Sequence, residues 1–398
     1  MHILKRAYML MARVSMFRSL QFLLILASVL AVVTFYYFGS ENQNFSSTTK
    51  RMKLSQASRK NNGNNADLSV DTRFSQLDGS REKETSGSDA FPSRKTGDKT
   101  LDQHFNVLMM FTKVDKNRGL QDKFKVAMLS MVKYAQFLEG EVLVLHFVSD
   151  SASKALGEKM LREFLTNATF KFEVLFHDVE ALTHKLFPIV EALQKHFSAG
   201  SWAYYSDAIF FLSVAMHHIL PKDLTRIVQL DIDLKYRTNI RDLFQEFDRF
   251  PPGAVLGIVR EMQPVYRHTF WQYRKENPQT RVGDPPPEGL PGFNSGVMLL
   301  DLAAMRASDL YNQLLDKRNV TKLAEKYSIK GHLGDQDFFT VISMEHPELF
   351  YSLACGWNRQ LCTWWRDHGY RDVFELYYQC DGPIYIYHGN CNTSIPDD

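Results

Sequence analysis

The feature that most constrains the fold is a regular alternation of two kinds of segment from about His104 onward. Short apolar, β-branched runs, typical of buried strands, take turns with stretches whose apolar residues recur at helical spacing. The strand-like runs are 105–112, 141–149, 170–179 and 226–230, and the helical stretches are 122–138, 153–165 and 208–220. This alternation predicts βαβ units and hence an α/β fold, a Rossmann-like, mostly parallel sheet flanked by helices.

Two aspartates directly follow the strand-like run 226–230. Asp231 and Asp233 are separated by Ile232, and a polar stretch comes next. Where a strand gives way to a loop such carboxylates can converge, and hard oxygen ligands at an open strand end suit Mg²⁺ or Mn²⁺ holding a diphosphate. The tripeptide alone is weak evidence, because acidic pairs in solvated turns are common.

Composition and motifs argue against several function classes. The formal net charge is +2 and no long basic run is present, so nucleic-acid binding has little support. The sequence contains neither Gly-x-Gly-x-x-Gly nor a P-loop, so a cradle of glycine amides for a dinucleotide or ATP is not expected. A diphosphate would have to be held by a metal and side chains.

The N-terminal part differs from the rest. Residues 20–38 are apolar and uncharged, and basic residues precede them, so we expect an uncleaved type II signal anchor with residues 1–19 as a cytoplasmic tail. A buried core helix is the alternative, and the polar sequence that follows argues against it. Residues 39–103 are rich in Ser, Asn and charged residues and predict a flexible, disordered lumenal stem. The catalytic domain would then comprise residues 104–398.

All four cysteines lie near the C-terminus, at Cys355, Cys362, Cys380 and Cys391. An even number in a lumenal segment points to two disulfides, for which three pairings exist. Zinc is the competing interpretation, but the spacings contain no C-x-x-C pair. We favour Cys355–Cys380 with Cys362–Cys391, which would fasten the tail to the body, although the sequence does not fix this connectivity.

Three further clusters stand at the boundaries of predicted elements. Asn294 and Ser295 begin an apolar run, Gln336 lies in the acidic start of an expected helix, and His388 ends a strand-like run. Each has an ordinary structural explanation, namely a loop-to-strand transition, helix capping and a buried histidine. Together with the aspartates, and in this order, they are specific.

That order resembles the retaining glycosyltransferases of family 8, which share the GT-A fold. The matching motifs are L-D-I-D at 230–233, F-N-S-G-V at 293–297, G-D-Q-D-F-F at 334–339 and Y-H-G-N at 387–390. The resemblance covers nearly all of 104–398, and the stem does not contribute.

The resemblance implies a metal-dependent sugar transfer. The nearest branch of the family transfers xylose from UDP-xylose, with retention, to the terminal xylose of Xyl-α1,3-Glc on folded EGF-like repeats such as those of Notch. Mn²⁺ would be the metal, with Mg²⁺ as a possible substitute. A glucoside xylosyltransferase or another UDP-sugar hexosyltransferase is the alternative, and a non-catalytic binder of EGF repeats is a third. The implied location is the endoplasmic reticulum membrane, with the Golgi as the alternative.

The same resemblance implies roles for individual residues. Asp231, Asp233 and His388 match metal ligands, and Gln336 matches the residue beside the anomeric carbon. The positions that match donor contacts are Thr112, Asp231, Ile232, Asn294, Ser295, Gln336 and Asn390. On the acceptor side we expect His268, Trp271, Trp365 and Asn390, whereas core packing explains Trp357 and Trp364 at least as well.

Two details bear on the mechanism. Gln336 is an amide and a poor nucleophile, which favours a front-face reaction over a double displacement. The sequence also lacks basic residues that many family members carry, since the corresponding positions are near Val214 and at Ser394. Lys113 or Lys116 is a candidate to screen the diphosphate instead.

Overall fold

The structure is a computed structural model that describes residues 70–75, 102–198 and 208–397. All of them belong to one compact unit, Ser47–Asp398. The strands are β1 Val70–Ser75, β2 Gln103–Phe111, β3 Glu141–Ser149, β4 Lys171–Asp178, β5 Arg226–Leu230, β6 Leu234–Tyr236, β7 Leu256–Arg260, β8 Phe293–Asp301, β9 Phe350–Leu353, β10 Arg359–Gln360 and β11 Ile386–His388. The α-helices are α3 Arg118–Tyr134, α4 Ser151–Phe164, α5 Val179–Lys185, α6 Phe187–Phe197, α7 Ile240–Phe244, α8 Val265–Thr269, α9 Trp271–Glu276, α10 Leu302–Ala307, α11 Asp309–Leu314, α12 Lys317–Lys326, α13 Asp335–Glu345 and α14 Arg371–Tyr378.

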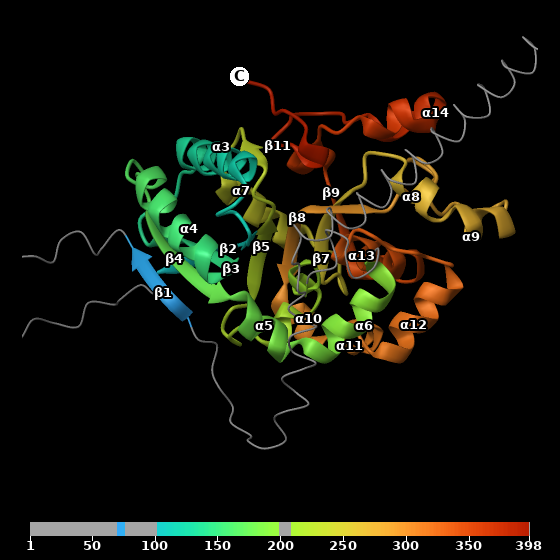
Figure 1. The fold of residues 1–398 in the computed structure, drawn as a ribbon, viewed down its shortest axis with the longest axis horizontal. Helices are drawn as coiled ribbons and strands as arrows, with labels where there is room; N and C mark the ends of the chain where they lie inside the picture. Colours follow the sequence, from blue (N-terminus) through green and yellow to red (C-terminus); the bar gives the residue numbers. More distant parts are fainter. Residues whose placement is uncertain (1–69, 76–101, 199–207, 398) are drawn as a thin grey trace, which may run out of the picture. The chain divides into compact units, whose positions relative to one another are not determined.

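Eight strands form the large sheet, in the order β1-β4-β3-β2-β5-β8-β7-β9 (Figure 1). The pairs β4–β3, β3–β2, β2–β5 and β7–β9 are parallel, whereas β8 runs antiparallel to both β5 and β7, and β1 runs antiparallel to β4. The predicted α/β fold with a mostly parallel sheet is therefore confirmed.

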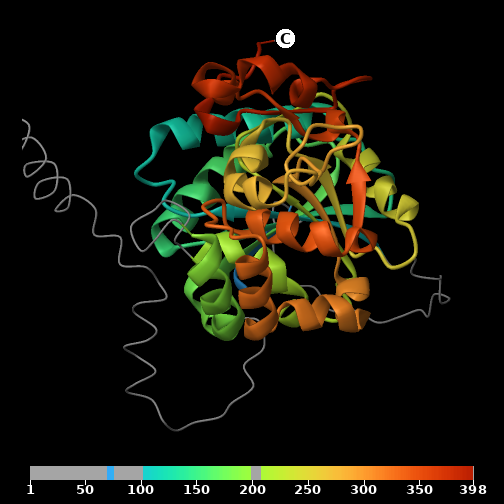
Figure 2. The ribbon, with the colours of Figure 1, turned by 90° about the vertical axis from the view of Figure 1, so that its right-hand side faces the viewer.

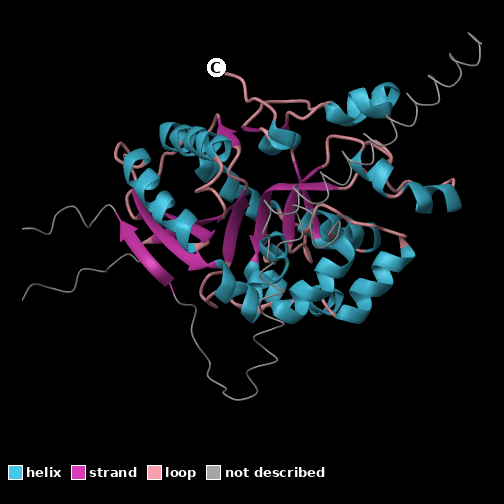
Figure 3. Ribbon diagram, viewed as in Figure 1, coloured by secondary structure: helices cyan, strands magenta, loops and turns pink. Residues whose placement is uncertain are grey.

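Helices cover the sheet on two sides (Figure 3). Alternate side chains of β2 point to opposite faces, so Met109 packs in the core under α3 and α4 while Leu108 packs in the core under α5, α6 and α10–α13. In α3 the buried Phe124, Ala127 and Met131 recur at helical spacing, which gives the helix its sheet-facing side. Each large buried side chain contributes about 1.5–3 kcal/mol.

A second, three-stranded sheet joins distant parts of the chain in the order β10-β11-β6. Since β11 runs antiparallel to β6, with His388 opposite Leu234, it brings the C-terminal segment beside the end of β5. In Figure 2 this C-terminal segment is red and lies on the opposite side of the molecule from α12. Disulfides Cys355–Cys380 and Cys362–Cys391 hold the segment, in the pairing that the sequence analysis favoured.

The structure departs from the sequence expectations in two places. The helix expected at 208–220 is instead a pair of short 3-10 turns, Ala208–Phe211 and Ser213–His218, with a kink at Ala215. The apolar run there is buried nearly all round, so its pattern lacked the periodicity that distinguishes an α-helix. The second place is β1, a strand within the predicted stem that pairs with β4 at the edge of the sheet.

The predicted cytoplasmic tail and signal anchor, residues 1–38, and most of the predicted stem lie outside the described residues. Within the part of the chain that the structure describes, no helix combines the length and apolarity needed to cross a bilayer.

Candidate active site

The two aspartates occupy the turn between β5 and β6, at the carboxyl end of β5. The backbone N–H of Asp231 donates to the carbonyl of Gly296, and the N–H of Gly389 donates to the carbonyl of Asp233, each at 2.9 Å. These two bonds connect the aspartate turn to β8 and to the segment after β11. Three stretches of chain that are far apart in sequence therefore meet here.

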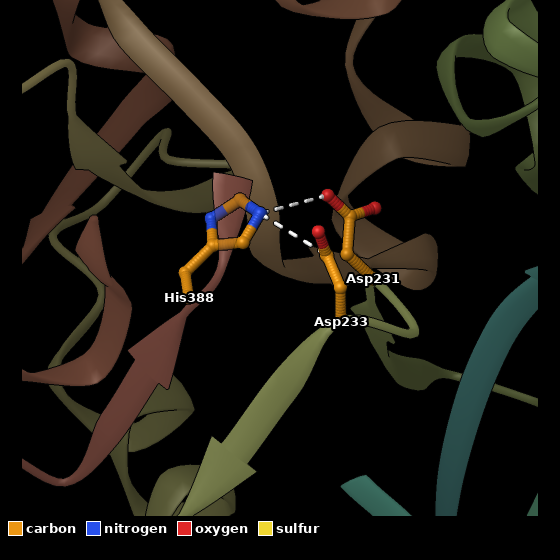
Figure 4. Close-up of side chains that lie close together, drawn as sticks. All are labelled: Asp231, Asp233 and His388. Atoms are coloured by element: carbon orange, nitrogen blue, oxygen red, sulfur yellow. Dashed lines mark ion pairs between the residues drawn. The ribbon is translucent and has the colours of Figure 1, made fainter. Parts of the chain in front are cut away.

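Asp231, Asp233 and His388 form the centre of the site (Figure 4). His388 Nε2 lies 3.4 Å from Asp231 Oδ2 and 3.3 Å from Asp233 Oδ1. One ligand atom from each residue falls within 4.8 Å of the others. Two carboxylates and one imidazole are a mixed O/N donor set that suits Mn²⁺ and leaves coordination positions for phosphate oxygens.

The charges of these groups depend on one another. Burial alone would lower the pKa of His388, but the carboxylates of Asp233 and Asp231 raise it above its usual value. Burial alone would raise the pKa of Asp233, but His388 and Lys123 lower it. Without a cation the site is therefore held together as ion pairs, and a divalent cation would replace the proton on Nε2.

Two contacts away from Nε2 hold the imidazole ring of His388 in position. Its Nδ1 lies 2.9 Å from Asn358 Oδ1. On its other side the ring packs against Gly296, where a β-carbon would come within 2.6 Å of Nδ1. A residue with a side chain at position 296 would therefore displace the imidazole.

Lys123 on α3 is a site residue that the sequence analysis missed. Its Nζ lies 3.4 Å from Asp233 Oδ2 and donates to the carbonyl of Gly389 at 3.0 Å. None of Lys113, Lys116 and Lys123 lines the cleft described below, so the contacts with Asp233 and Gly389 are what associate Lys123 with the site. Nothing in the local pattern distinguishes Lys123 from its neighbour Lys125, so only the folded position of α3 identifies it.

The three candidate ligands border a cleft of about 310 Å³. Its lining includes every residue predicted to contact the donor: Thr112, Asp231, Ile232, Asn294, Ser295, Gln336 and Asn390. A larger cavity of about 880 Å³ opens among the beginnings of β2 and β5 but contains none of these residues. We take the smaller cleft as the site because its chemistry, and not its size, matches the predicted ligands.

Gln336 lies in the first turn of α13, against the start of β8. The helix begins after Gly334, whose φ of 71° is in the left-handed region that favours glycine. Gln336 Oε1 accepts from the N–H of Ser295 at 3.2 Å, and its Nε2 lies 3.4 Å from Glu261 Oε2. Gln336 and Ser295, which were both expected to contact the donor, therefore lie side by side in one cleft.

The two acids beside Gln336 are engaged elsewhere. Asp337 is fully buried, accepts from Tyr266 Oη at 2.9 Å and accepts from two backbone N–H groups at 2.6 and 2.7 Å. Asp335 accepts from Ser213 Oγ at 2.5 Å, and burial raises the pKa of its carboxyl to about 7. Asp337 therefore holds the loop before α13, and Asp335 is tied to Ser213.

Three of the four residues expected on the acceptor side, His268, Trp271 and Trp365, line an adjoining hollow, whereas Asn390 lines the cleft itself. The lining of the hollow comprises His268, Thr269, Trp271, Lys330, His332, Trp364 and Trp365, and it shares His332 and Trp365 with the cleft. Trp271 and Trp364 are 59% and 50% exposed, so Trp364 is a surface residue, whereas Trp357 is buried. Asn390 Oδ1 accepts from the N–H groups of Leu361 and Cys362, so its amide nitrogen is the group that it can offer to a ligand.

Comparisons with known proteins agree with this geometry. The family model described as glycosyl transferase family 8 matches residues 128–364. Xyloside xylosyltransferase 1 of mouse is 59% identical over 389 residues, covering 98% of this chain and 97% of the mouse protein, and the human protein is 58% identical over 390 residues, again covering 98% and 97%. The crystal structure of the mouse protein in its apo form superposes with a TM-score of 0.71 at 66% identity, covering 74% of this chain and 100% of that one.

Proposed function

Since the chain belongs to glycosyl transferase family 8, we propose that it is a retaining α-1,3-xylosyltransferase that transfers xylose from UDP-xylose to the terminal xylose of a xyloside. The observation that carries the proposal is the meeting of Asp231, Asp233 and His388 at one cleft that Gln336 also lines. The near full-length similarity to proteins named for xyloside xylosylation supports the choice of donor and acceptor.

The residues would divide the work as follows. Asp231, Asp233 and His388 would hold Mn²⁺, or Mg²⁺ in its place. When bound, the cation supplies a Lewis acid that neutralises the charge on the departing UDP. Asn294 and Ser295 orient the donor sugar from the start of β8. Lys123 adds positive charge beside Asp233, in a site that lacks the basic residues of many family members.

Gln336 favours a front-face reaction. The two carboxylates next to it in sequence are engaged in other contacts, because Asp337 is committed to the loop and Asp335 is bonded to Ser213. The acceptor hydroxyl then approaches on the face from which UDP leaves. As its oxygen bonds to the anomeric carbon, the bond from that carbon to the phosphate oxygen breaks, and the hydroxyl proton passes to a phosphate oxygen. The protein positions the reactants and stabilises the developing charge.

The aromatic hollow would receive the acceptor. The exposed Trp271 and the partly buried Trp365 offer aromatic faces that can stack on the apolar faces of sugars, and exposed aromatic residues also anchor protein surfaces. The hollow is continuous with the donor cleft through Trp365. It therefore suits a xylose–glucose disaccharide presented on a folded EGF-like repeat, with the rest of the repeat outside the hollow.

The location is part of the same proposal. The uncharged run at 20–38, preceded by basic residues, fits a single-pass type II protein, and two disulfides fit an oxidising lumen. We place the protein in the endoplasmic reticulum membrane, with the Golgi as the alternative.

A transfer assay tests the function. Full-length protein is given UDP-xylose or UDP-glucose, with an EGF repeat that carries either Xyl-Glc or glucose alone, in the presence and absence of Mn²⁺. We expect xylose transfer to the Xyl-Glc repeat only, and only with the metal. Transfer to the glucose-only repeat would make the protein a glucoside xylosyltransferase. Absence of both transfer and binding of Mn²⁺–UDP would refute an enzymatic role.

A further inference from the structure

We propose that Glu261 is a positioning residue, whose carboxylate orients the amides of Asn294 and Gln336 and, through Asn358, presents Nε2 of His388 to the metal position. Glu261 directly follows β7 and is 1% exposed. The inference deepens the proposed function, since it concerns the same site. Neither the motif order nor the resemblance pointed to this residue.

One oxygen of Glu261 serves two amides. Asn294 Nδ2 donates to Glu261 Oε2 at 3.2 Å, and Gln336 Nε2 lies 3.4 Å from the same oxygen. Glu261 Oε1 has no hydrogen-bond partner among the described residues. A carboxylate oxygen accepts and does not donate, so both amides must turn their nitrogens toward it and their oxygens away.

The first of two hydrogen-bond paths from Glu261, here called branches, leads through Asn294 and Asn358 to the metal ligand His388. Asn294 Oδ1 accepts from the backbone N–H of Gly296 at 3.1 Å and from Asn358 Nδ2 at 2.8 Å. Because Asn358 gives its nitrogen to Asn294, its oxygen is the atom that faces His388 Nδ1 at 2.9 Å.

That oxygen selects one tautomer of the neutral imidazole. A carbonyl oxygen accepts, so Nδ1 of His388 must carry the hydrogen and the lone pair must be on Nε2, the atom that faces Asp231 and Asp233. With the oxygen and nitrogen of Asn358 exchanged, the lone pair would lie on Nδ1, pointing away from the metal. Glu261 thus supports the orientation of the metal ligand His388 through two intervening amides, Asn294 and Asn358, without contacting a metal ligand itself.

The second branch runs to the reacting sugar. With its nitrogen near Glu261 Oε2 and Tyr266 Oη, Gln336 directs Oε1 to the N–H of Ser295, along the wall of the donor cleft. Burial raises the pKa of Glu261 to about 7, and the donors around it favour the charged form. A buried acid that forms no ion pair with a described residue is costly to keep, which argues that its placement serves the site rather than stability.

The test compares two substitutions at this position in the full-length protein. E261Q keeps an oxygen that can accept from both amides, whereas E261M has nearly the same length but offers no strong acceptor. The readouts are Mn²⁺ affinity, from titration of the free Mn²⁺ paramagnetic resonance signal without nucleotide, and kcat and KM for UDP-xylose.

We expect E261M to weaken Mn²⁺ binding about tenfold and to lower kcat about tenfold or more, with a smaller change in KM. E261Q should recover most of both losses. The proposal is overturned if the two variants are equally defective, or if E261M matches the wild type in both readouts.

A second variant covers the case in which E261M does not fold. N358L interrupts the branch between Asn294 and His388 and leaves Glu261 and Gln336 in place. It should weaken Mn²⁺ binding about tenfold, and wild-type affinity would refute the tautomer argument. If wild-type protein binds Mn²⁺ but transfers no xylose, the proposed function fails while the titrations still decide the role of Glu261.

Discussion

Gly296 and the imidazole of His388 are packed so closely that no β-carbon fits between them. A β-carbon at position 296 would lie 2.6 Å from His388 Nδ1, well inside van der Waals contact. The glycine in the F-N-S-G-V motif therefore has a steric role, because it makes room for a side chain from the other end of the domain.

Gly296→Ala should displace His388 and weaken Mn²⁺ binding about tenfold or more, because a misplaced ligand loses coordination geometry. Gly119→Ala is the control, since only Asn117 Oδ1 lies near its added β-carbon, at 3.6 Å in an exposed turn of α3. The measurement is Mn²⁺ affinity alongside the thermal midpoint. Equal affinities for the two variants would contradict the packing argument.

Gln336→Ala should separate binding from turnover. In the proposed mechanism other groups hold UDP and Gln336 lies beside the anomeric carbon, so UDP affinity should stay within about threefold, whereas kcat should fall about a hundredfold. Kinetics of xylose transfer and UDP titration give the two values. Detection by intact mass of a xylosyl adduct on Asp335, Asp337 or Glu261 would defeat the front-face mechanism.

Lys123→Met should weaken UDP binding in the presence of Mn²⁺ by about tenfold at low salt, because the positive charge beside Asp233 is removed. Lys125→Met is a matched control, with the same charge change two residues along α3 on an exposed position. Calorimetric titration at two salt concentrations checks the result. If both variants lose the same affinity, the effect is general electrostatics and Lys123 has no specific place in the site.

Strands were the part of the fold that the sequence predicted well. The runs at 141–149 and 226–230 became β3 and β5 with the same bounds, because mostly apolar runs of this length suit buried strands. The prediction of a helix at 208–220 was wrong because the segment is buried on all sides. Leu212, Met216 and the residues between them are all buried, so the sequence shows no helical periodicity. The small sheet β10-β11-β6 joins residues far apart in sequence, which no local pattern encodes.

The site shows a similar division. Motif order was sufficient to place Asp231, Asp233 and His388 together, and in the structure Asp231 directly follows β5, Asp233 directly precedes β6 and His388 ends β11. It was not sufficient for Lys123 or Glu261, because their roles depend on which neighbours a helix and a strand end meet after folding. Orientation of an amide such as that of Asn358 is set by hydrogen bonds to β8 and β11, and so is invisible in sequence.

His146 should limit stability in acid. Its Nε2 lies 3.1 Å from Asn106 Oδ1, and burial, followed by the nearby His177 and His104, lowers its pKa to about 3. The folded state keeps this imidazole neutral while the unfolded chain binds a proton below about pH 6.5, so stability is lost as pH falls, by at most about 1.4 kcal/mol per unit.

His146→Gln should flatten this dependence, as measured by the free energy of unfolding in denaturant at pH 7, 6 and 5. An identical acid slope in wild type and His146→Gln would show that other groups control the transition.

The two disulfides close loops of similar length but lie at different distances from the chemistry. Their sequence separations are 25 and 29 residues, so loop entropy assigns each a similar stabilisation of about 3–4 kcal/mol. Of the four cysteines, Cys391 alone lines the cleft that holds the candidate metal ligands, and it directly follows Asn390.

Replacing Cys362 and Cys391 with serines should therefore weaken binding of Mn²⁺–UDP at least about tenfold. Replacing Cys355 and Cys380 with serines should cost comparable stability and leave the affinity for Mn²⁺–UDP within about threefold. Unfolding in denaturant and UDP titration of the two double variants separate these effects, and equal losses of affinity would mean that the second disulfide acts on the site only through global stability.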